Sequence, residues 1–501
     1  MNRPRRISAV WLLFSSLLLS LAVPRALADV AAEVQAVTQD KVMRKATLGV
    51  SVVRIGASAG EDKVLFEHGS DKQFIPASNL KLVTTAAALE TFGPAFKFKT
   101  VLLRVGDDLV LIGDGDPALG DAEYLKKAGW KSHTLFEWWA SQLKDRLGVR
   151  TVRDVIIDDG VFDDEFVHPR WPADQLHKRY CPELAGLNFN ANCVDFQVQA
   201  QSPGQVVAFQ IDPATRYVTV RNSCVGGKDN SIWLSRDPNR GNEILLRGEA
   251  KGSTREPVSV TIHDPGAYTG TVLAETLTAS GIARTGKVRR ERGFRARREK
   301  GDAPVREWQV VGIHETPLST VLLRANKDSM NLYAESLCKR LGFEASGGKE
   351  AGSWANGTAA MGKWLKSIGV ADGDYAFDDG SGMSRQNLVT PRALTKVLSH
   401  EFHGRNRDGY LVSLSVAGVD GTLEDRFKAP YTDLRGRVIG KSGYVNGVRT
   451  LSGYLKAKDG NHYAFSILMN GLPEGDAQAK VLQERIVRAI DTQSTAVAAG
   501  E

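Results

Sequence analysis

"FIPASNLKLVTTAAALETFG", residues 74–93, places a serine and, three residues later, a lysine at the start of an Ala-, Leu- and Thr-rich stretch typical of a helix. Two interpretations of this stretch are open. Ser78 is either an ordinary N-cap, with Lys81 solvated on the first turn, or a nucleophile whose base is Lys81. The motif S-x-x-K does not decide between them, because it also occurs at Ser141, Ser336 and Ser346.

The segments around this helix predict one antiparallel sheet that is built from both ends of the chain. Residues 48–55 and 63–69 have the pattern of two β-strands, and three more strands follow at 437–447, 448–460 and 462–471, joined by Asn-Gly and Asp-Gly turns. A closing helix at about 476–492 has one broad apolar face. The first and last segments are therefore expected to form one domain of the α/β (α+β) class.

The middle of the chain has a different pattern. Alternating apolar and polar runs dominate residues 100–290, and helical patterns return at 315–342 and 390–404. A chain of 501 residues is also too long for one simple core. We therefore expect a discontinuous domain, residues 29–100 and 290–501, interrupted by an inserted mainly-β region, residues 101–289.

The first 28 residues have the composition of a cleavable export signal. Arginines at 3, 5 and 6 precede an apolar run from Ala9 to Val23, and Ala26-Leu27-Ala28 follows. The run of about 15 residues is shorter than the roughly 20 that a membrane span needs. Cleavage after Ala28 is expected, which predicts an exported protein of the periplasm or the outer face of the inner membrane, without stable membrane insertion. An uncleaved anchor is the alternative.

Charge argues against nucleic acid as the main partner. Removal of residues 1–28 removes four arginines and lowers the formal net charge from +7 to +3, a small excess for a chain of this length. One stretch, Lys287 to Lys300, stays locally basic. We expect it to be a solvated loop or domain boundary, and binding to an anionic cell-wall polymer is the alternative.

The four cysteines are too few to form the framework of the fold, although an even number permits disulfides in an exported chain. Cys193 and Cys224 lie in neighbouring strand-like stretches and are the first candidates for a pair. Cys338 falls in a helical pattern and is expected to pack as a small apolar residue.

No metal or cofactor is predicted. None of the cysteines has zinc-type spacing, and the stretch "GDGDP", residues 113–117, is expected to be a tight turn. His400 and His403 are three residues apart, whereas zincin helices need a spacing of four. We therefore expect both histidines to be surface residues.

If Ser78 is a nucleophile, Lys81 must take its proton. Residues i and i+3 share one face of a helix, so the amine of Lys81 can reach the Ser78 hydroxyl. Lysine acts as a base only if its pKa falls far below the usual value of about 10.4. Burial and a neighbouring cation lower it, and the backbone N–H of Ser78 can stabilise an oxyanion.

The second cation is available in the only K-[ST]-G of the chain, Lys441-Ser442-Gly443, on the first C-terminal strand. Lys441 can raise the local positive potential, and Ser442 can hydrogen-bond a carboxylate. Gly443 lets a substrate backbone lie close along the strand, and the N–H of Tyr444 can serve as the second oxyanion donor. Taken alone, the motif is also compatible with a strand that leads into a turn.

A third element, Ser329-Met330-Asn331, opens the helical stretch "LYAESLCKRLG". Ser329 could relay a proton toward a leaving group, and Asn331 could hold Lys81 and a substrate amide. An ordinary helix cap is the alternative for this serine.

S-x-x-K, S-x-N and K-S-G, in this order, are typical of the serine penicillin-binding proteins and β-lactamases. The chain resembles the low-molecular-mass penicillin-binding proteins of the D-alanyl-D-alanine carboxypeptidase/endopeptidase type, peptidase family S13. The resemblance covers nearly all of the mature chain, including "LIGDGDPAL", "LNFNANCVDFQV" and "DDGSGMSRQNLVTP". The family's large insert after the S-x-x-K helix separates it from β-lactamases. Met330 within S-x-N and Ser442 for threonine in K-T-G are small departures that leave rate and substrate preference open.

The resemblance implies a penicillin-binding-protein/β-lactamase-like transpeptidase domain, a five-stranded antiparallel sheet flanked by helices, with a large mainly-β insert. It implies a carboxypeptidase/endopeptidase that cleaves peptidoglycan stem peptides ending in D-Ala-D-Ala through an acyl-enzyme on Ser78, and that β-lactams acylate. A serine β-lactamase and a catalytically weak peptidoglycan-binding scaffold are the alternatives. The candidate catalytic residues are Ser78, Lys81, Ser329, Asn331 and Lys441, and the candidate substrate-binding residues are Ser442, Gly443 and Tyr444.

Overall fold

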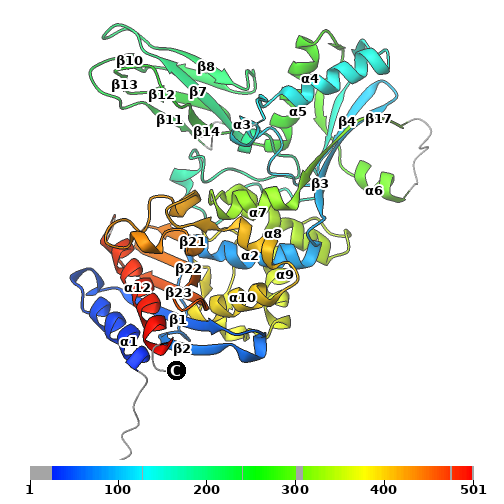
Figure 1. Cartoon of the computed structure of the whole chain (residues 1–501). Helices are drawn as coiled ribbons and strands as arrows, with labels where there is room; N and C mark the ends of the chain where they lie inside the picture. Colours follow the sequence, from blue (N-terminus) through cyan, green and yellow to red (C-terminus); the bar gives the residue numbers. More distant parts are fainter. Residues whose placement is uncertain are drawn as a thin grey trace, which may run out of the picture.

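The computed structural model describes residues 25–498, except 127, 238, 240, 301–307, 474 and 476. The predicted export signal falls mainly on residues 1–24, outside the described residues, and α1 (Arg25–Thr38) is the first described element. Within the described residues, no helix is long and apolar enough to cross a membrane. Figure 1 shows two lobes: both ends of the described chain lie in the lower lobe, and the middle of the chain forms the upper lobe.

The lower lobe is built on an antiparallel sheet that joins the two ends of the chain. Its strand order is β2-β1-β23-β22-β21-β20, and β1 pairs with β23 from Thr47–Asn470 to Ile55–His462. The five predicted strands are confirmed, and the short strand β20 adds a sixth. The strands are β1 Thr47–Ile55, β2 Lys63–His68, β20 Ser415–Val416, β21 Val438–Val445, β22 Val448–Lys456 and β23 His462–Asn470.

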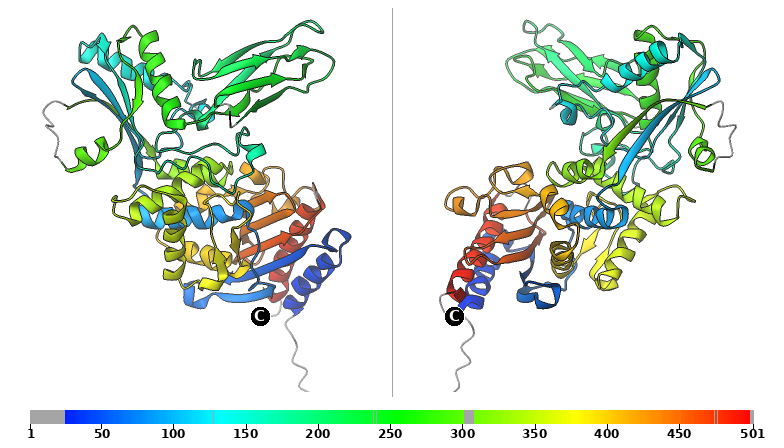
Figure 2. Two further views of the ribbon diagram at one scale, coloured as in Figure 1. Left: turned by 180° about the vertical axis from the view of Figure 1, so that it is seen from behind. Right: turned by 45° about the vertical axis from the view of Figure 1, so that its right-hand side comes forward.

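Helices cover both faces of this sheet. α1 and α12 (Gln478–Ala498) lie side by side on one face, coloured blue and red in Figures 1 and 2. α10 (Pro391–His403) packs on β1 and β23 from the other face. The further helices of this lobe are α2 Leu80–Phe92, α7 Leu318–Asn326, α8 Asn331–Ala345, α9 Trp354–Ser367 and α11 Arg407–Ser413.

The helix predicted from residues 74–93 is the central helix of this layer. In α2 every residue from Leu80 to Leu89 is buried, and α7, α8, α9, α10 and α11 all contact it. A helix that is apolar on all sides is expected in such an enclosed position. The three consecutive alanines, 86–88, let its neighbours approach closely. Lys81 is therefore held inside a packed core.

The upper lobe is mainly β. Its largest sheet has the order β16-β6-β4-β3-β17, and two three-stranded sheets have the orders β14-β7-β8 and β11-β12-β9. Its helices are α3 Ala122–Lys126, α4 Thr134–Ser141, α5 Pro265–Ala279 and α6 Phe294–Lys300. The strands of these sheets are β3 Lys97–Val105, β4 Asp108–Ile112, β6 Val155–Asp158, β7 Cys193–Gln199, β8 Ala208–Asp212, β9 Thr219–Asn222, β11 Trp233–Arg236, β12 Glu243–Arg247, β14 Val258–Thr261, β16 Val288–Arg290 and β17 Trp308–Pro317.

Two-residue strands complete the secondary structure, and the antiparallel pair of β3 and β17 carries the chain between the lobes. The short strands are β5 Thr151–Val152, β10 Val225–Gly226, β13 Glu249–Ala250, β15 Ala283–Arg284, β18 Tyr375–Ala376 and β19 Leu388–Val389. β3 and β17 pair from Lys97–Pro317 to Val105–Trp308 (Figure 1). The predicted insert limits at 101 and 289 stay a prediction, and this pairing favours wider limits near 97 and 317.

The basic stretch from Lys287 to Lys300 contains β16 and α6, so the prediction of a solvated loop is wrong, and the prediction of a domain boundary stays a prediction. β16 is an edge strand beside β6, and α6 follows it. Several of its described arginines form ion pairs with acidic residues of the same lobe, which offsets their charge. The pairs are Arg289–Asp154 at 2.8 Å, Arg290–Asp159 at 3.0 Å, Arg292–Asp159 at 2.9 Å and Arg295–Asp114 at 2.5 Å.

Arg290→Ala is expected to lower the free energy of unfolding by about 1–3 kcal/mol. The Asp159 side chain is fully buried, and the substitution leaves it with one ion-pair partner, Arg292. Urea unfolding measures the change. Arg297→Ala is the control, because Arg297 is exposed and its partner Glu291, on the same segment, is only partly buried. Equal effects of the two substitutions would contradict a structural role for Arg290.

All four cysteines are free and buried, so the expected Cys193–Cys224 disulfide is wrong. Cys193 begins β7, whereas Cys224 follows β9, and these strands belong to different sheets. The Cys193 thiol donates to the carbonyl of Ala191. Cys338 is fully buried in the core around α2, so its predicted apolar packing is confirmed.

The two histidines of α10, predicted to be surface residues, are partly buried and partly exposed. His403 Nε2 lies 2.9 Å from Asp62 Oδ1, and the His400 ring makes an edge contact with Trp364. Asp116, in the "GDGDP" stretch, accepts hydrogen bonds from the N–H of Ala118 and the hydroxyl of Thr316. These acceptor contacts hold Asp116 within the fold.

Candidate active site

Ser78 lies in a single 3-10 turn, Ala77–Asn79, that leads directly into α2. Ala77 has a positive φ of 47°, which turns the backbone sharply before the helix starts. The N-cap residue of α2 is Asn79, and its side chain makes no capping hydrogen bond. The Ser78 hydroxyl instead accepts a hydrogen bond from Lys81 Nζ at 3.0 Å. The N-cap interpretation of Ser78 is therefore wrong.

Lys81 is fully buried and has three hydrogen-bond acceptors around its amine. Besides Ser78 Oγ, these are Asn331 Oδ1 at 2.7 Å and the carbonyl of Ser381 at 2.9 Å. Burial lowers the pKa of Lys81 to about 8, although the charges of Glu335 and Asp379 act in the opposite direction. A substantial fraction of this lysine is consequently neutral near pH 8.

Lys441 lies on β21 and is also fully buried. Its amine donates to the carbonyl of Ser442 at 2.8 Å. Burial lowers the pKa of Lys441 well below its usual value, and the positive charge of Lys81 lowers it further. The charge of Lys81 therefore disfavours protonation of Lys441, whereas the pKa of Lys81 itself is lowered by burial.

Gly443 lets β21 lie directly against the start of α2. A Cβ atom at this position would be 2.9 Å from the backbone nitrogen of Ser78 and 2.2 Å from Thr450 Oγ1. Real Cβ atoms do not approach so closely, so a larger residue forces the strand and the turn apart. Ser442 is partly buried and Tyr444 is 49% exposed.

Ser329 and Asn331 lie where α7 ends and α8 begins. Ser329 has a positive φ of 56°, and Asn331 is the first residue of α8. The Asn331 amide nitrogen donates to the carbonyl of Tyr180 at 2.6 Å while its oxygen holds Lys81. Asn331 thus connects the buried lysine to the insert.

Sequence reasoning missed a buried acid that supports this arrangement. Glu335, on α8, accepts hydrogen bonds from the N–H groups of Gly380 at 2.9 Å and Ser381 at 2.8 Å, and from Trp354 Nε1 at 2.8 Å. It thereby fixes the loop whose Ser381 carbonyl accepts from Lys81. The Asp- and Gly-rich pattern of "DDGSGMS" was a turn signal, but nothing local indicated that Glu335 holds it.

The other three S-x-x-K motifs do not bring their serine and lysine together. Lys144 donates to the carbonyl of Ser280, and Lys339 forms an ion pair with Asp163 at 2.6 Å. Their serine hydroxyls donate to backbone carbonyls, Ser141 to Trp138, Ser336 to Gly115 and Ser346 to Phe343. A fully buried lysine amine that donates to the serine hydroxyl distinguishes the Ser78 motif.

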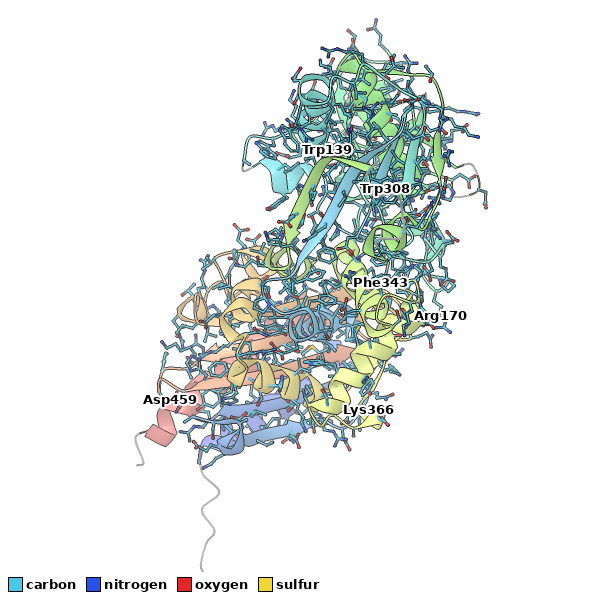
Figure 3. The ribbon with its side chains drawn as sticks, turned by 90° about the vertical axis from the view of Figure 1, so that its right-hand side faces the viewer. Trp139, Arg170, Trp308, Phe343, Lys366 and Asp459 are labelled. Atoms are coloured by element: carbon cyan, nitrogen blue, oxygen red, sulfur yellow. The ribbon has the colours of Figure 1, made fainter. Side chains whose placement is uncertain are left out.

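A cleft of about 650 Å³ opens over Ser78, between the two lobes. Arg170, labelled in Figure 3, comes from the insert and forms an ion pair with Asp378 of the lower lobe. The insert therefore contributes one wall of the cleft. The side chains around the reactive centre are Ser78, Ser329, Asn331 and Tyr444 from the lower lobe and Arg170 and Tyr180 from the insert.

A smaller cavity of about 200 Å³ also borders Ser78, and its other side is basic. Arg449 lies on β22 opposite Tyr444, with its guanidinium 3.8 Å from the centre of that ring. Burial and the charges of Arg449 and Arg426 lower the pKa of Lys480. None of the described residues that line this cavity is acidic. The cavity therefore suits an anionic group next to the nucleophile.

A buried amine beside a serine, at the mouth of a cleft, is the arrangement that the S13 resemblance implies. The model of the "D-Ala-D-Ala carboxypeptidase 3 (S13) family" matches residues 30–493. The chain belongs to the S13 family. The predicted family, its carboxypeptidase class and the enzyme prediction are thereby confirmed.

The sequence of this chain aligns with those of individual relatives over most of its length. It is 31% identical over 474 residues to the D-alanyl-D-alanine carboxypeptidase of Actinomadura sp. strain R39, covering 89% of this chain and 81% of the relative. It is 24% identical over 454 residues to D-alanyl-D-alanine carboxypeptidase DacB of Haemophilus influenzae, covering 88% and 89%.

The fold of this S13 member also has solved counterparts. The crystal structure of penicillin binding protein 4 (dacB) from Haemophilus influenzae aligns with a TM-score of 0.73 at 24% identity, covering 92% of this chain and 99% of that one. The same protein complexed with a β-lactam aligns with a TM-score of 0.68 at 24% identity, covering 91% and 98%. The predicted fold class is confirmed.

Proposed function

We propose that this S13 member is an exported D-alanyl-D-alanine carboxypeptidase/endopeptidase that acts on peptidoglycan stem peptides through an acyl-enzyme on Ser78. The observation that carries the proposal is the 3.0 Å contact between Ser78 Oγ and the fully buried amine of Lys81. A buried lysine with a lowered pKa is the base that a serine nucleophile needs. The arginines and the apolar run before Ala28 support export.

In the acylation step, Ser78 Oγ attacks the carbonyl carbon of the penultimate D-alanine and Lys81 takes the hydroxyl proton. The N–H groups of Ser78 and Tyr444 stabilise the oxyanion. The C–N bond then breaks, and the leaving amine accepts a proton with the help of Ser329 and Lys441. Asn331 holds Lys81 and the substrate amide during this step.

Water attacks the acyl-enzyme in the second step, which releases the shortened peptide and returns the proton to Ser78. The basic cavity beside Ser78 receives the carboxylate of the leaving D-alanine, with Ser442 as a hydrogen-bond donor. A β-lactam follows the same acylation path. Its leaving nitrogen stays attached to the acyl group, so the covalent product persists.

A labelled penicillin tests the nucleophile. Native protein is expected to become covalently labelled, Ser78→Ala is expected to remain unlabelled, and Ser346→Ala, from another S-x-x-K motif, is expected to label normally. Failure of native protein to react, or labelling of Ser78→Ala, would refute the proposal. Release of D-alanine from a pentapeptide distinguishes an enzyme from a scaffold that only binds peptidoglycan. Slow turnover of nitrocefin distinguishes this enzyme from a β-lactamase.

The rate of acylation is expected to rise with pH, with a midpoint near 8. Lys81 must be neutral to accept the proton, and its pKa of about 8 sets the fraction that is neutral. Because the charge of Glu335 raises that pKa, Glu335→Gln is expected to move the midpoint to lower pH. Labelling rates between pH 5.5 and 9.5 measure it, with Glu344→Gln on the same helix as the control. A midpoint that stays or rises in Glu335→Gln would contradict this assignment.

Lys480→Ala is expected to raise KM for a pentapeptide about 3- to 10-fold with little change in kcat, and less at high salt. Lys480 is an exposed cation at the edge of the basic cavity, so it attracts the terminal carboxylate without touching the reacting atoms. A pentapeptide with a C-terminal amide is expected to show no difference between native protein and variant. Lys428→Ala, an exposed lysine paired with Asp425, is the control.

A further inference from the structure

Three potential metal ligands meet at the end of α2 that is remote from Ser78. Glu90 lies in the last turn of α2, and His400 and Glu401 lie in the last turn of α10. One ligand atom from each side chain lies within 4.8 Å of the other two. At a rise of about 1.5 Å per residue, the cluster is roughly 15–18 Å along the helix from Ser78.

Among the described residues, no cation forms an ion pair with Glu90 or Glu401. Glu401 is 1% exposed, and neither of its carboxylate oxygens has a hydrogen-bond partner. Burying a polar group without a hydrogen-bond partner is unfavourable. Glu90 adds a second negative charge, and the C-terminal end of α2 adds the partial negative charge of its free carbonyls. The nearby guanidinium of Arg407 stacks on Phe402 at 3.8 Å.

Neighbouring side chains hold two of the three ligands in place. Asn406 Nδ2 donates to Glu90 Oε1 at 2.9 Å, which leaves the second oxygen of Glu90 available. The ring of Trp364 contacts the His400 ring edge-on, with the ring centres 6.1 Å apart. Outer contacts of this kind orient ligands around metal ions.

We propose that Glu90, His400 and Glu401 bind a divalent transition-metal ion, with Zn²⁺ the best match to one imidazole nitrogen and two carboxylate oxygens. Three protein ligands leave one tetrahedral position for water. Because the ligands come from α2 and α10, the ion joins the helix that follows the nucleophile to the helix that covers β1 and β23. Its role is structural, and the chemistry at Ser78 does not involve it.

Isothermal titration of the chelator-treated mature protein with ZnCl₂ tests the proposal. One ion per chain is expected to bind with a Kd of about 10 µM or below and to raise the melting temperature by several degrees. Glu401→Gln and His400→Gln are each expected to weaken binding at least tenfold. His403→Gln is the control and is expected to bind normally, because His403 lies on the same helix as His400 but its ring contacts Asp62 instead of the cluster.

Labelling by penicillin is expected to stay unchanged in all three variants, so the result does not depend on the function proposed for Ser78. Circular dichroism confirms that each variant is folded. Absence of saturable Zn²⁺ binding at 100 µM by native protein overturns the proposal. Undiminished binding by folded Glu401→Gln also overturns it, because the ion then binds elsewhere.

Discussion

Lys81→Met is expected to lower the rate of acylation by a labelled penicillin by a factor of about 10² to 10⁴. The substitution removes the amine that lies 3.0 Å from Ser78 Oγ, and keeps most of the volume of a fully buried side chain. The serine is then left without a base, while the cleft and the oxyanion donors remain. Stopped-flow or gel-based labelling of native protein and variant measures the ratio.

Lys144→Met is the matched control for this experiment. It removes the lysine of another S-x-x-K motif, whose amine donates to the carbonyl of Ser280 instead of a serine hydroxyl. Its labelling rate is expected to stay within about twofold of native. A Lys81→Met protein that is folded and reacts at the native rate would exclude Lys81 as the base.

Gly443→Ala is expected to reduce acylation by about 10²- to 10³-fold, the usual effect of disturbing an oxyanion donor. The added Cβ would meet Thr450 Oγ1 at 2.2 Å and the Ser78 nitrogen at 2.9 Å, so β21 must move away from the turn that carries Ser78. Acylation rates with a penicillin and with a thioester substrate both report this displacement.

Gly409→Ala is the control for Gly443→Ala, because a Cβ there meets no atom within 4 Å. It is expected to acylate at the native rate. Thermal unfolding followed by circular dichroism separates a local displacement from loss of the fold. Native-like acylation by a folded Gly443→Ala protein would show that the contact between β21 and Ser78 does not matter for the reaction.

The contacts that the sequence could predict are the ones governed by short-range geometry. The spacing of Ser78 and Lys81 on one helix face brings their side chains together, and strand alternation together with turn chemistry indicated β21, β22 and β23. Family resemblance then indicated that distant segments meet at this helix. The sheet order follows from those two sources together.

The contacts that the sequence could not predict join residues far apart in the chain. Glu335 supports the loop at Ser381, and Arg290 pairs with Asp159 across more than a hundred residues. Neither pairing leaves a periodic signal, so the sequence alone predicts a solvated basic stretch. The same limit explains the wrong disulfide, since similar strand patterns at Cys193 and Cys224 do not reveal that the strands belong to different sheets.

The pairing of β1 with β23 sets the order in which the protein can mature. β1 ends at Ile55, and its partner β23 exists only after His462–Asn470 has been synthesised. The lower lobe therefore closes only after almost the whole chain is available. The segment between β3 and β17 has its own sheets and is complete much earlier. Because Lys441 and Gly443 lie on β21, a chain that ends before this strand lacks the part of the site that packs against the turn of Ser78.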